Sequence, residues 1–106
     1  MNPSDYAVVL TTTASEEETE KIAQALLEQR LAACVQATPI KSYYTWKGQV
    51  HQDQEALLLI KCKAADYAEI EKCIRANHSY EVPEIVQLPL TNGSQDYLGW
   101  ISQVTS

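Results

Sequence analysis

The 106-residue sequence lacks phenylalanine, and its aromatic content consists of six tyrosines and two tryptophans. Tyrosine and tryptophan pack their rings against apolar groups while their polar atoms take a hydrogen-bond partner, so we expect half-buried aromatic positions. The sequence also lacks internal repeats, linkers and low-complexity tracts. These features predict a single domain over residues 1–106, which is within the usual size range.

Basic residues are few, and the formal net charge is −6. Nucleic-acid binding needs clustered lysine and arginine, so this class of function is not expected. No stretch reaches the ~18 apolar residues of a membrane span, and the N-terminus lacks the pattern of a secretory signal. The three cysteines are an odd number without a disulfide-like spacing, which favours a reducing, cytoplasmic location.

Several sequence motifs of known chemistry are also missing. Without C-x-x-C or clustered cysteines, a copper-chaperone domain, a thiolate zinc site and a bacterial ferredoxin are not expected. The aliphatic run Leu57–Ile60 does not suit an RNA-recognition sheet. We find no Gly-rich phosphate loop and no nucleophile with an evident base, so we do not expect an enzyme.

The first half of the chain predicts a strand, a helix and a second strand. Residues 6–13 are apolar and β-branched, which is typical of a buried strand. Ser15 and Glu18 have the spacing of a capping box at the start of a helix. The apolar residues of that helix are expected to face a sheet, namely Ile22, Ala23, Leu26 and Leu27. The next strand runs from about residue 34 to 46, with an interruption or kink at Pro39.

The second half predicts the remaining elements of a recognisable fold class. A turn at residues 47–49 leads into a strand over 50–63, and Asp66 with Glu69 predicts another capped helix. Its inner face is expected to carry Tyr67, Ile70, Cys73 and Ile74. A strand over 84–90 and a helix over 97–104 follow. The order β-α-β-β-α-β with a terminal helix predicts an α+β, ferredoxin-like split βαβ fold.

The two central strands are each about twice the usual length of ~5–6 residues. Such a hairpin overhangs a four-stranded sheet whose outer strands are shorter, and it leaves backbone edges that need cover. Pairing with further copies of the chain is the simplest cover. We therefore expect a homo-oligomer of closed symmetry.

The segment 78–85 concentrates polar chemistry, because it holds an imidazole, a phenol and two carboxylates around Pro83. His78 ends a predicted helix, where it could bond a carbonyl group or bind a ligand. Glu81 and Glu84 are expected on opposite faces of an extended segment, so they do not by themselves form a general acid–base pair. We expect Glu84 in a cleft.

Four more positions have both a structural and a functional interpretation. Lys61 interrupts an apolar strand, either as a partner of Glu84 or as a strand end that faces water. Tyr44 and Trp46 lie on one face of a strand, where packing explains them but they could also line a cleft. Cys62 and Cys73 suit a core, and Cys34 is the cysteine to test for reactivity.

Five blocks in a fixed order then point to a known family: Arg30–Val35, Ser42–Gly48, Glu55–Lys61, His78–Ile85 and Tyr97–Trp100. With these blocks the chain resembles the CutA divalent-cation-tolerance proteins along nearly its whole length. The resemblance implies a ferredoxin-like, heat-resistant homotrimer, similar in plan to the PII signalling proteins. It also implies a link to tolerance of copper and other divalent metals. It implies no catalytic reaction.

The resemblance implies site residues as well. The copper site proposed for some relatives uses a cysteine and two adjacent histidines, and Thr11 and Asn77 stand here at two of those positions. A metal site would rest on His78 with Glu81 or Glu84, which is richer in oxygen and less selective than the relatives' site. The implied ligand-binding residues of an intersubunit cleft are Tyr44, Trp46, Lys61, His78, Tyr80 and Glu84.

The expected function is that of a trimeric, non-enzymatic binding and regulatory protein with no obligatory cofactor. Its expected partners are further copies of itself and Cu²⁺ or another divalent cation, bound weakly, without nucleic acid or membrane. Three alternatives stay open. They are a PII-like sensor of a small molecule, a structural trimer that anchors partners, and an uncharacterised enzyme.

Overall fold

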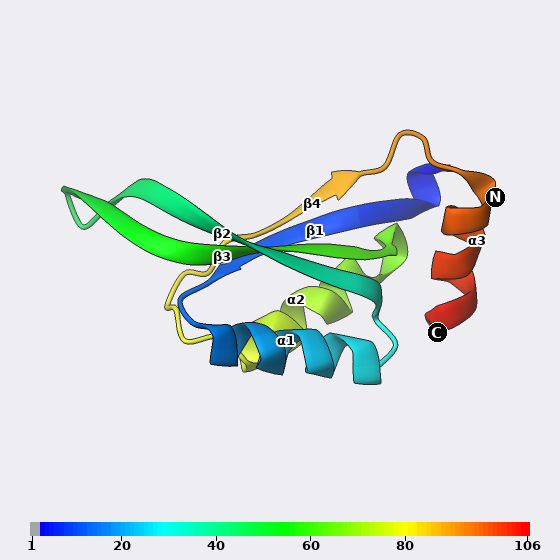
Figure 1. The fold of residues 1–106 in the computed structure, drawn as a ribbon, viewed down its shortest axis with the longest axis horizontal. Helices are drawn as coiled ribbons and strands as arrows, with labels where there is room; N and C mark the ends of the chain where they lie inside the picture. Colours follow the sequence, from blue (N-terminus) through cyan, green and yellow to red (C-terminus); the bar gives the residue numbers. More distant parts are fainter. Residues whose placement is uncertain (1–2) are drawn as a thin grey trace.

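The computed structural model describes residues 3–106, and their elements follow the predicted order (Figure 1). The strands are β1 (Tyr6–Thr13), β2 (Ala32–Trp46), β3 (Gln49–Lys63) and β4 (Ile85–Pro89). The α-helices are α1 (Glu16–Glu28), α2 (Tyr67–Ala76) and α3 (Gln95–Val104). Short 3₁₀ turns, η1 (Pro3–Asp5) and η2 (Ala64–Asp66), precede β1 and α2. The predicted α+β class is confirmed.

The four strands of the described chain form one antiparallel sheet in the order β2-β3-β1-β4. Helices α1 and α2 lie side by side against one face of this sheet (Figure 1). Helix α3 lies at the end of the sheet where β1 begins, and its Leu98 and Ile101 pack with Tyr6 and Ala33. The two helices α1 and α2 therefore cover one face, whereas α3 covers only one end of the molecule.

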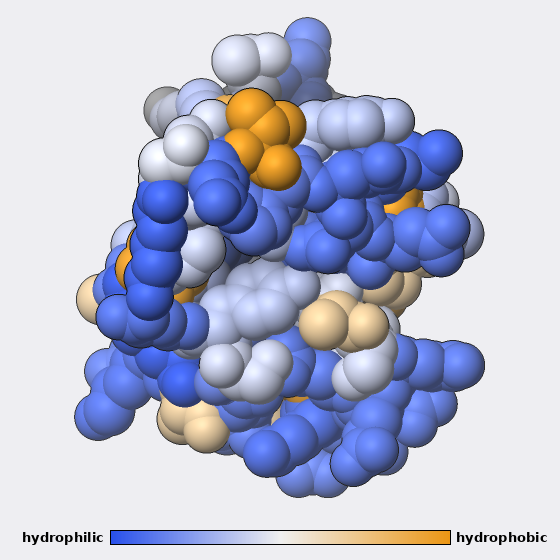
Figure 2. All heavy atoms as spheres, turned by 90° about the vertical axis from the view of Figure 1, so that its left-hand side faces the viewer, coloured by the Kyte–Doolittle hydropathy of each residue, from blue (hydrophilic) through white to orange (hydrophobic). Residues whose placement is uncertain are grey.

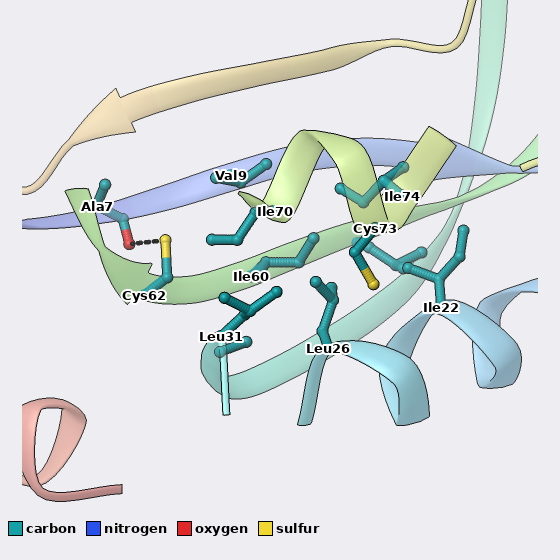
Figure 3. Packing of buried hydrophobic residues seen from close by; sticks show 12 residues of the cluster. Ala7, Val9, Ile22, Leu26, Leu31, Ile60, Cys62, Ile70, Cys73 and Ile74 are labelled. Atoms are coloured by element: carbon teal, nitrogen blue, oxygen red, sulfur yellow. Dashed lines mark hydrogen bonds between the residues drawn. The ribbon is translucent and has the colours of Figure 1, made fainter. Parts of the chain in front are cut away.

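The hydrophobic core lies between the sheet and the two helices α1 and α2 (Figure 3). Val9 and Ile60 are paired neighbours on β1 and β3, and both are fully buried. The helices add fully buried residues at helical spacing, namely Ile22, Leu26, Ile70 and Ile74. Burying each such side chain contributes about 1.5–3 kcal/mol, so this layer fixes the sheet on its helices.

Two of the three cysteines belong to this core, as predicted. Cys62 is fully buried and its thiol donates a hydrogen bond to the Ala7 carbonyl at 3.6 Å (Figure 3). Burial is the main reason that the pKa of the Cys62 thiol rises to about 12. Cys73 lies on the inner face of α2, and burial raises its pKa as well.

The β2–β3 hairpin projects beyond the rest of the sheet (Figure 1). Both strands have 15 residues, whereas β1 has 8 and its pairing with β3 ends at Thr13 and Ala56. Lys47 and Gly48 have φ values of 52° and 78°, the left-handed conformation of a tight two-residue hairpin turn. Residues 40–55 therefore form an overhanging arm, as the strand lengths predicted.

The sheet face opposite α1 and α2 carries an apolar patch that we call the open face. Its residues alternate with the core residues of the same strands, and they are Val8, Leu10, Leu57, Leu59, Val86 and Leu88. Val86 and Leu88 are 45% and 48% exposed, and the other four are half-buried. Within the described chain, α1 and α2 leave this face uncovered.

Two expectations about packing are wrong. Pro39 does not interrupt β2, since it pairs with Ala56 and the irregularity of β2 lies at Ala32–Cys34. Because β2 is an edge strand, a proline without an N–H is tolerated there. Leu27 does not face the sheet and is 44% exposed, because the buried stripe of α1 is narrow and centred on Ile22 and Leu26.

The two predicted capping boxes also differ from the structure. The Ser15 hydroxyl accepts a hydrogen bond from the Glu18 N–H at 3.1 Å, as expected. The Glu18 carboxylate, however, accepts a hydrogen bond from the Ser79 N–H at 3.2 Å, so its partner lies outside α1. Asp66 makes no side-chain cap, because it is already part of the helical turn η2.

Candidate ligand-binding cleft

A cleft of about 580 Å³ lies between the overhanging arm and the segment that joins α2 to β4. Its size is typical of small-molecule sites. Figure 2 views the molecule from the side of the hairpin tip, and this side is mostly hydrophilic. The lining residues are Thr12, Ser42, Tyr43, Tyr44, Trp46, Glu55, Ser79, Tyr80, Glu81, Val82 and Glu84.

The aromatic residues come from two separate parts of the chain. Tyr44 and Trp46 belong to β2, and both line the cleft. Tyr80 belongs to the segment after α2, and its hydroxyl donates a hydrogen bond to Glu55 Oε2 at 2.6 Å. This bond joins the α2–β4 segment to β3, so it fixes the width of the cleft between them.

The surroundings of the Tyr44 and Tyr80 hydroxyl groups raise the pKa of both phenols. The Tyr44 hydroxyl donates to the Asp53 carboxylate, which raises the pKa of Tyr44. Burial, followed by the hydrogen bond to Glu55, raises the pKa of Tyr80 well above its ordinary value. The Tyr44 ring also stacks on His51, with ring centroids 5.6 Å apart. Both rings therefore stay neutral while the neighbouring carboxylates carry negative charge.

Three carboxylates line the cleft, and no lysine, arginine or histidine of the described chain does. Glu55 is half-buried, whereas Glu81 and Glu84 are exposed. Glu81 was expected on the opposite face from Glu84, but the structure brings both to the cleft. The reason is a bend at Glu81 and Val82, which replaces the expected extended conformation. The cleft is thus an acidic site with aromatic walls.

His78 supports the cleft from inside and does not line it. Its side chain is 0% exposed, and its Nε2 lies 2.6 Å from the Thr12 carbonyl oxygen. Its Nδ1 accepts a hydrogen bond from the Tyr80 N–H at 3.1 Å and lies 3.4 Å from Glu18 Oε1. Both ring nitrogens already have partners, so the imidazole has no free position for a metal ion.

Lys61 does not lie at the cleft either. Its ammonium group donates a hydrogen bond to Gln36 Oε1 at 3.0 Å and lies 5.7 Å from the centre of the Tyr97 ring. Lys61 pairs with Val8 on the sheet, four residues before Thr12 on β1. Within one chain, Lys61 therefore does not partner Glu84.

Thr11 and Asn77, which the family resemblance placed at expected ligand positions, lie in the core and at the end of a helix. Thr11 is fully buried on β1. The Asn77 amide donates a hydrogen bond to the Cys73 carbonyl at 2.8 Å, at the end of α2. Over residues 3–106 there is no group of three or more His, Cys, Asp or Glu side chains placed to hold a metal ion. One chain thus does not provide the soft ligands that copper prefers.

The prediction from the sequence did not include several residues that line the cleft. Glu55 is the most important of these, because it holds Tyr80. Its position two residues before Leu57 placed it on the open-face side of β3, the side of the hairpin that also carries Tyr44, and this alternation could have identified it. Thr12, Ser42 and Ser79 had no comparable signal.

The chain is similar in sequence to a described protein family and its members. The family model "CutA1 divalent ion tolerance protein" matches residues 7–104. The divalent-cation tolerance protein CutA of Thermus thermophilus is 46% identical over 99 residues, which cover 92% of this chain and 96% of the relative. The chloroplastic protein CutA of Arabidopsis thaliana is 40% identical over 92% of this chain, but this chain spans only 54% of that protein.

The fold agrees with solved structures as well. The periplasmic divalent cation tolerance protein CutA from Archaeoglobus fulgidus superposes with a TM-score of 0.93 at 36% identity, covering 95% of this chain and 99% of the other. The Thermus thermophilus protein has a TM-score of 0.92 at 45% identity, with coverages of 95% and 99%. Sequence and fold lead to the same result: the chain belongs to the CutA1 divalent ion tolerance protein family.

Proposed function

We propose that the chain assembles into a homotrimer of ferredoxin-like subunits through its open face and its overhanging arm. The open face supports this proposal, because monomeric proteins rarely leave a contiguous apolar patch of this kind in water. The arm supports it too, since β2 is a 15-residue edge strand whose outer backbone groups need cover.

Within this trimer, we propose that the cleft is a divalent-cation site of a non-enzymatic protein that contributes to metal tolerance, copper included. The observation that carries the proposal is the acidic lining of the cleft, which holds Glu55, Glu81 and Glu84 and, among the described residues, no basic side chain. Within the described part of one chain these carboxylates do not form a ready coordination group, so we propose that water and neighbouring subunits supply the remaining ligands. The names of the relatives agree with this role. Both ring nitrogens of His78 already have partners within the chain, so the ligands that the cleft offers to a metal ion are mainly oxygen atoms. We therefore expect weak binding with little preference for Cu²⁺.

Calorimetric titration of the metal-stripped protein with Cu²⁺ and Zn²⁺ tests the proposal. The double variant Glu81→Gln/Glu84→Gln should bind both ions several-fold more weakly, because two of the three carboxylates are gone. Glu20→Gln/Glu28→Gln is the matched control, since it removes two exposed charges from α1. If the double variant and the parent chain bind the ions equally, the cleft is not the site.

A PII-like sensor of a small molecule is the second candidate. It is favoured by the volume of about 580 Å³ and the aromatic walls, which exceed what a metal ion needs. Catalysis has less support. Among the described residues that line the cleft, several carry hydroxyl groups, but none is a histidine or lysine that could act as the general base for a hydroxyl nucleophile. A screen of nucleotides and metabolites by thermal shift would separate the two candidates.

We further propose that the protein works in the cytoplasm. Cys34, Cys62 and Cys73 are all free thiols, which agrees with a reducing compartment. Among residues 3–106, no helix has the length and apolar character to cross a membrane. The name of the Archaeoglobus fulgidus relative places that protein in the periplasm, so fractionation of cells with an antibody to this chain is the appropriate test.

A further inference from the structure

We propose that the cleft also binds small organic cations, in which an ammonium group is attached to an apolar body. This inference rests on the proposed function, because it uses the same cleft and names a class of ligand for it. Three observations carry it: the charge of the lining, the aromatic walls, and an ammonium group of the chain that already lies over one of these walls.

The charge of the lining selects for cations. Glu55, Glu81 and Glu84 face the cleft, and the carboxylate of Asp53 lies next to it through its bond with Tyr44. No basic side chain belongs to the described lining, Lys47 is the one lysine that lies over an aromatic residue of it, and the whole chain has a formal net charge of −6. Their summed field raises the local concentration of cations and repels anions such as phosphates.

The aromatic walls favour cations that have an apolar body. Tyr44, Trp46 and Tyr80 are aromatic residues of the lining, and Tyr43 borders it from the opposite face of β2. An ammonium group over such a ring is attracted by the negative face of the π-system, and tryptophan gives the strongest interaction. The two tyrosines that donate to carboxylates keep neutral rings, so this attraction persists over the physiological pH range.

One contact between an ammonium group and an aromatic ring of the cleft already exists within the chain. The ammonium group of Lys47 lies 5.8 Å from the centre of the Trp46 ring, within the range of a cation–π contact. Lys47 belongs to the exposed hairpin turn and can move away at little cost. A ligand ammonium group can therefore replace it at Trp46, with the carboxylate of Glu84 or Glu81 nearby in the same cleft.

A bare metal ion uses only part of this site. Divalent ions need several oxygen ligands at about 2.0–2.6 Å, and residues 3–106 hold no group of three or more acidic, histidine or cysteine side chains so placed. The rings and the volume of about 580 Å³ are explained by a larger ligand. A primary or quaternary ammonium ion with an apolar body uses the rings and fits within this volume.

Calorimetry with three probes that share a phenyl group on a short chain tests the inference on the oligomer as purified. The probes are 2-phenylethylammonium, the neutral 2-phenylethanol and the anionic 3-phenylpropionate. We expect the ammonium ion to bind at least about tenfold more tightly than the alcohol, the anion not to bind, and added salt to weaken binding of the cation. Equal binding of the ammonium ion and the alcohol would overturn the inference.

Two variants locate the binding site. Trp46→Leu keeps an apolar surface but removes the π-face, and Glu84→Gln removes one charge of the lining. Each should weaken binding of 2-phenylethylammonium by about threefold or more, whereas Glu28→Gln should leave it unchanged. If Glu28→Gln weakens binding as much as Glu84→Gln, the effect is one of net charge and the assignment to the cleft fails.

A parallel titration with Zn²⁺ separates this inference from the proposed function. If Zn²⁺ binds in a manner that depends on Glu81 and Glu84 but the ammonium ion does not bind, the inference is wrong and the proposed function stands. If neither ligand binds, both are wrong. If both bind and compete, the two share the cleft, as we propose.

Discussion

Replacing His78 by alanine should destabilise the protein strongly, because the imidazole is a buried support of the cleft. The change removes the partner of the Thr12 carbonyl, at 2.6 Å, and of the Tyr80 N–H, at 3.1 Å. It also removes a ring that packs against Tyr80 with centroids 4.8 Å apart. The carboxylate of Glu18 loses a neighbour 3.4 Å away.

The size of the effect follows from these contacts. Both hydrogen bonds are partly buried, so each backbone group left without a partner costs about 1 kcal/mol, the low end of the ~1–3 kcal/mol range, and the two together cost about 2 kcal/mol. The side chain is fully buried, so alanine also leaves a cavity and loses packing. We expect a loss of at least about 3 kcal/mol in the free energy of unfolding.

Denaturant titrations at one fixed protein concentration measure this loss, since the stability of an oligomer depends on concentration. His51→Ala is the control, because His51 lies on the overhanging arm and stacks only on the exposed Tyr44 ring. It should cost less than about 1 kcal/mol. A His78→Ala protein that keeps its stability but loses metal binding would refute this reasoning and restore His78 as a ligand.

Three further predictions concern the termini of helices, pH and heat. Ser15→Ala should cost about 1 kcal/mol in urea titrations, because the cap of α1 is lost, and an unchanged midpoint would contradict the cap. Burial raises the pKa of the Cys62 thiol to about 12 in the folded chain, whereas the unfolded chain loses this proton near the ordinary thiol pKa. The contribution of Cys62 to the free energy of unfolding is therefore fully present below the ordinary pKa and is lost as the pH rises through about 9–12. Cys62→Ala should lose less stability over that interval, and an equal loss would exclude this cause. Calorimetry should give a melting midpoint above the ~45–65 °C of ordinary domains, since trimer contacts add to stability, and a midpoint within that range would count against them.

The order of the elements was predictable because local patterns determine it. The apolar alternation of β3 and the helical spacing of Ile70, Cys73 and Ile74 appear in the structure as predicted. The length of the hairpin and its overhang were also predictable, since residue counts alone give the mismatch with β1.

The direction of single side chains was harder to predict. Glu18 has the sequence signature of a capping box, yet it bonds to Ser79, which lies 61 residues further along the chain. His78 and Lys61 have the chemistry of ligand-binding residues, but each is satisfied by a partner that is distant in sequence. Local spacing carries no information on such contacts, because the packing of α1 and β2 against other elements decides them.

The central claim of this account is that the open face and the overhanging arm join three chains around the cleft. Multi-angle light scattering after size-exclusion chromatography, at micromolar concentration, tests it most directly. The account predicts a mass of three times the 11.9 kDa chain, and Leu59→Glu, which puts a charge on the open face, should lower it. A parent protein that elutes with the mass of one chain would contradict the account.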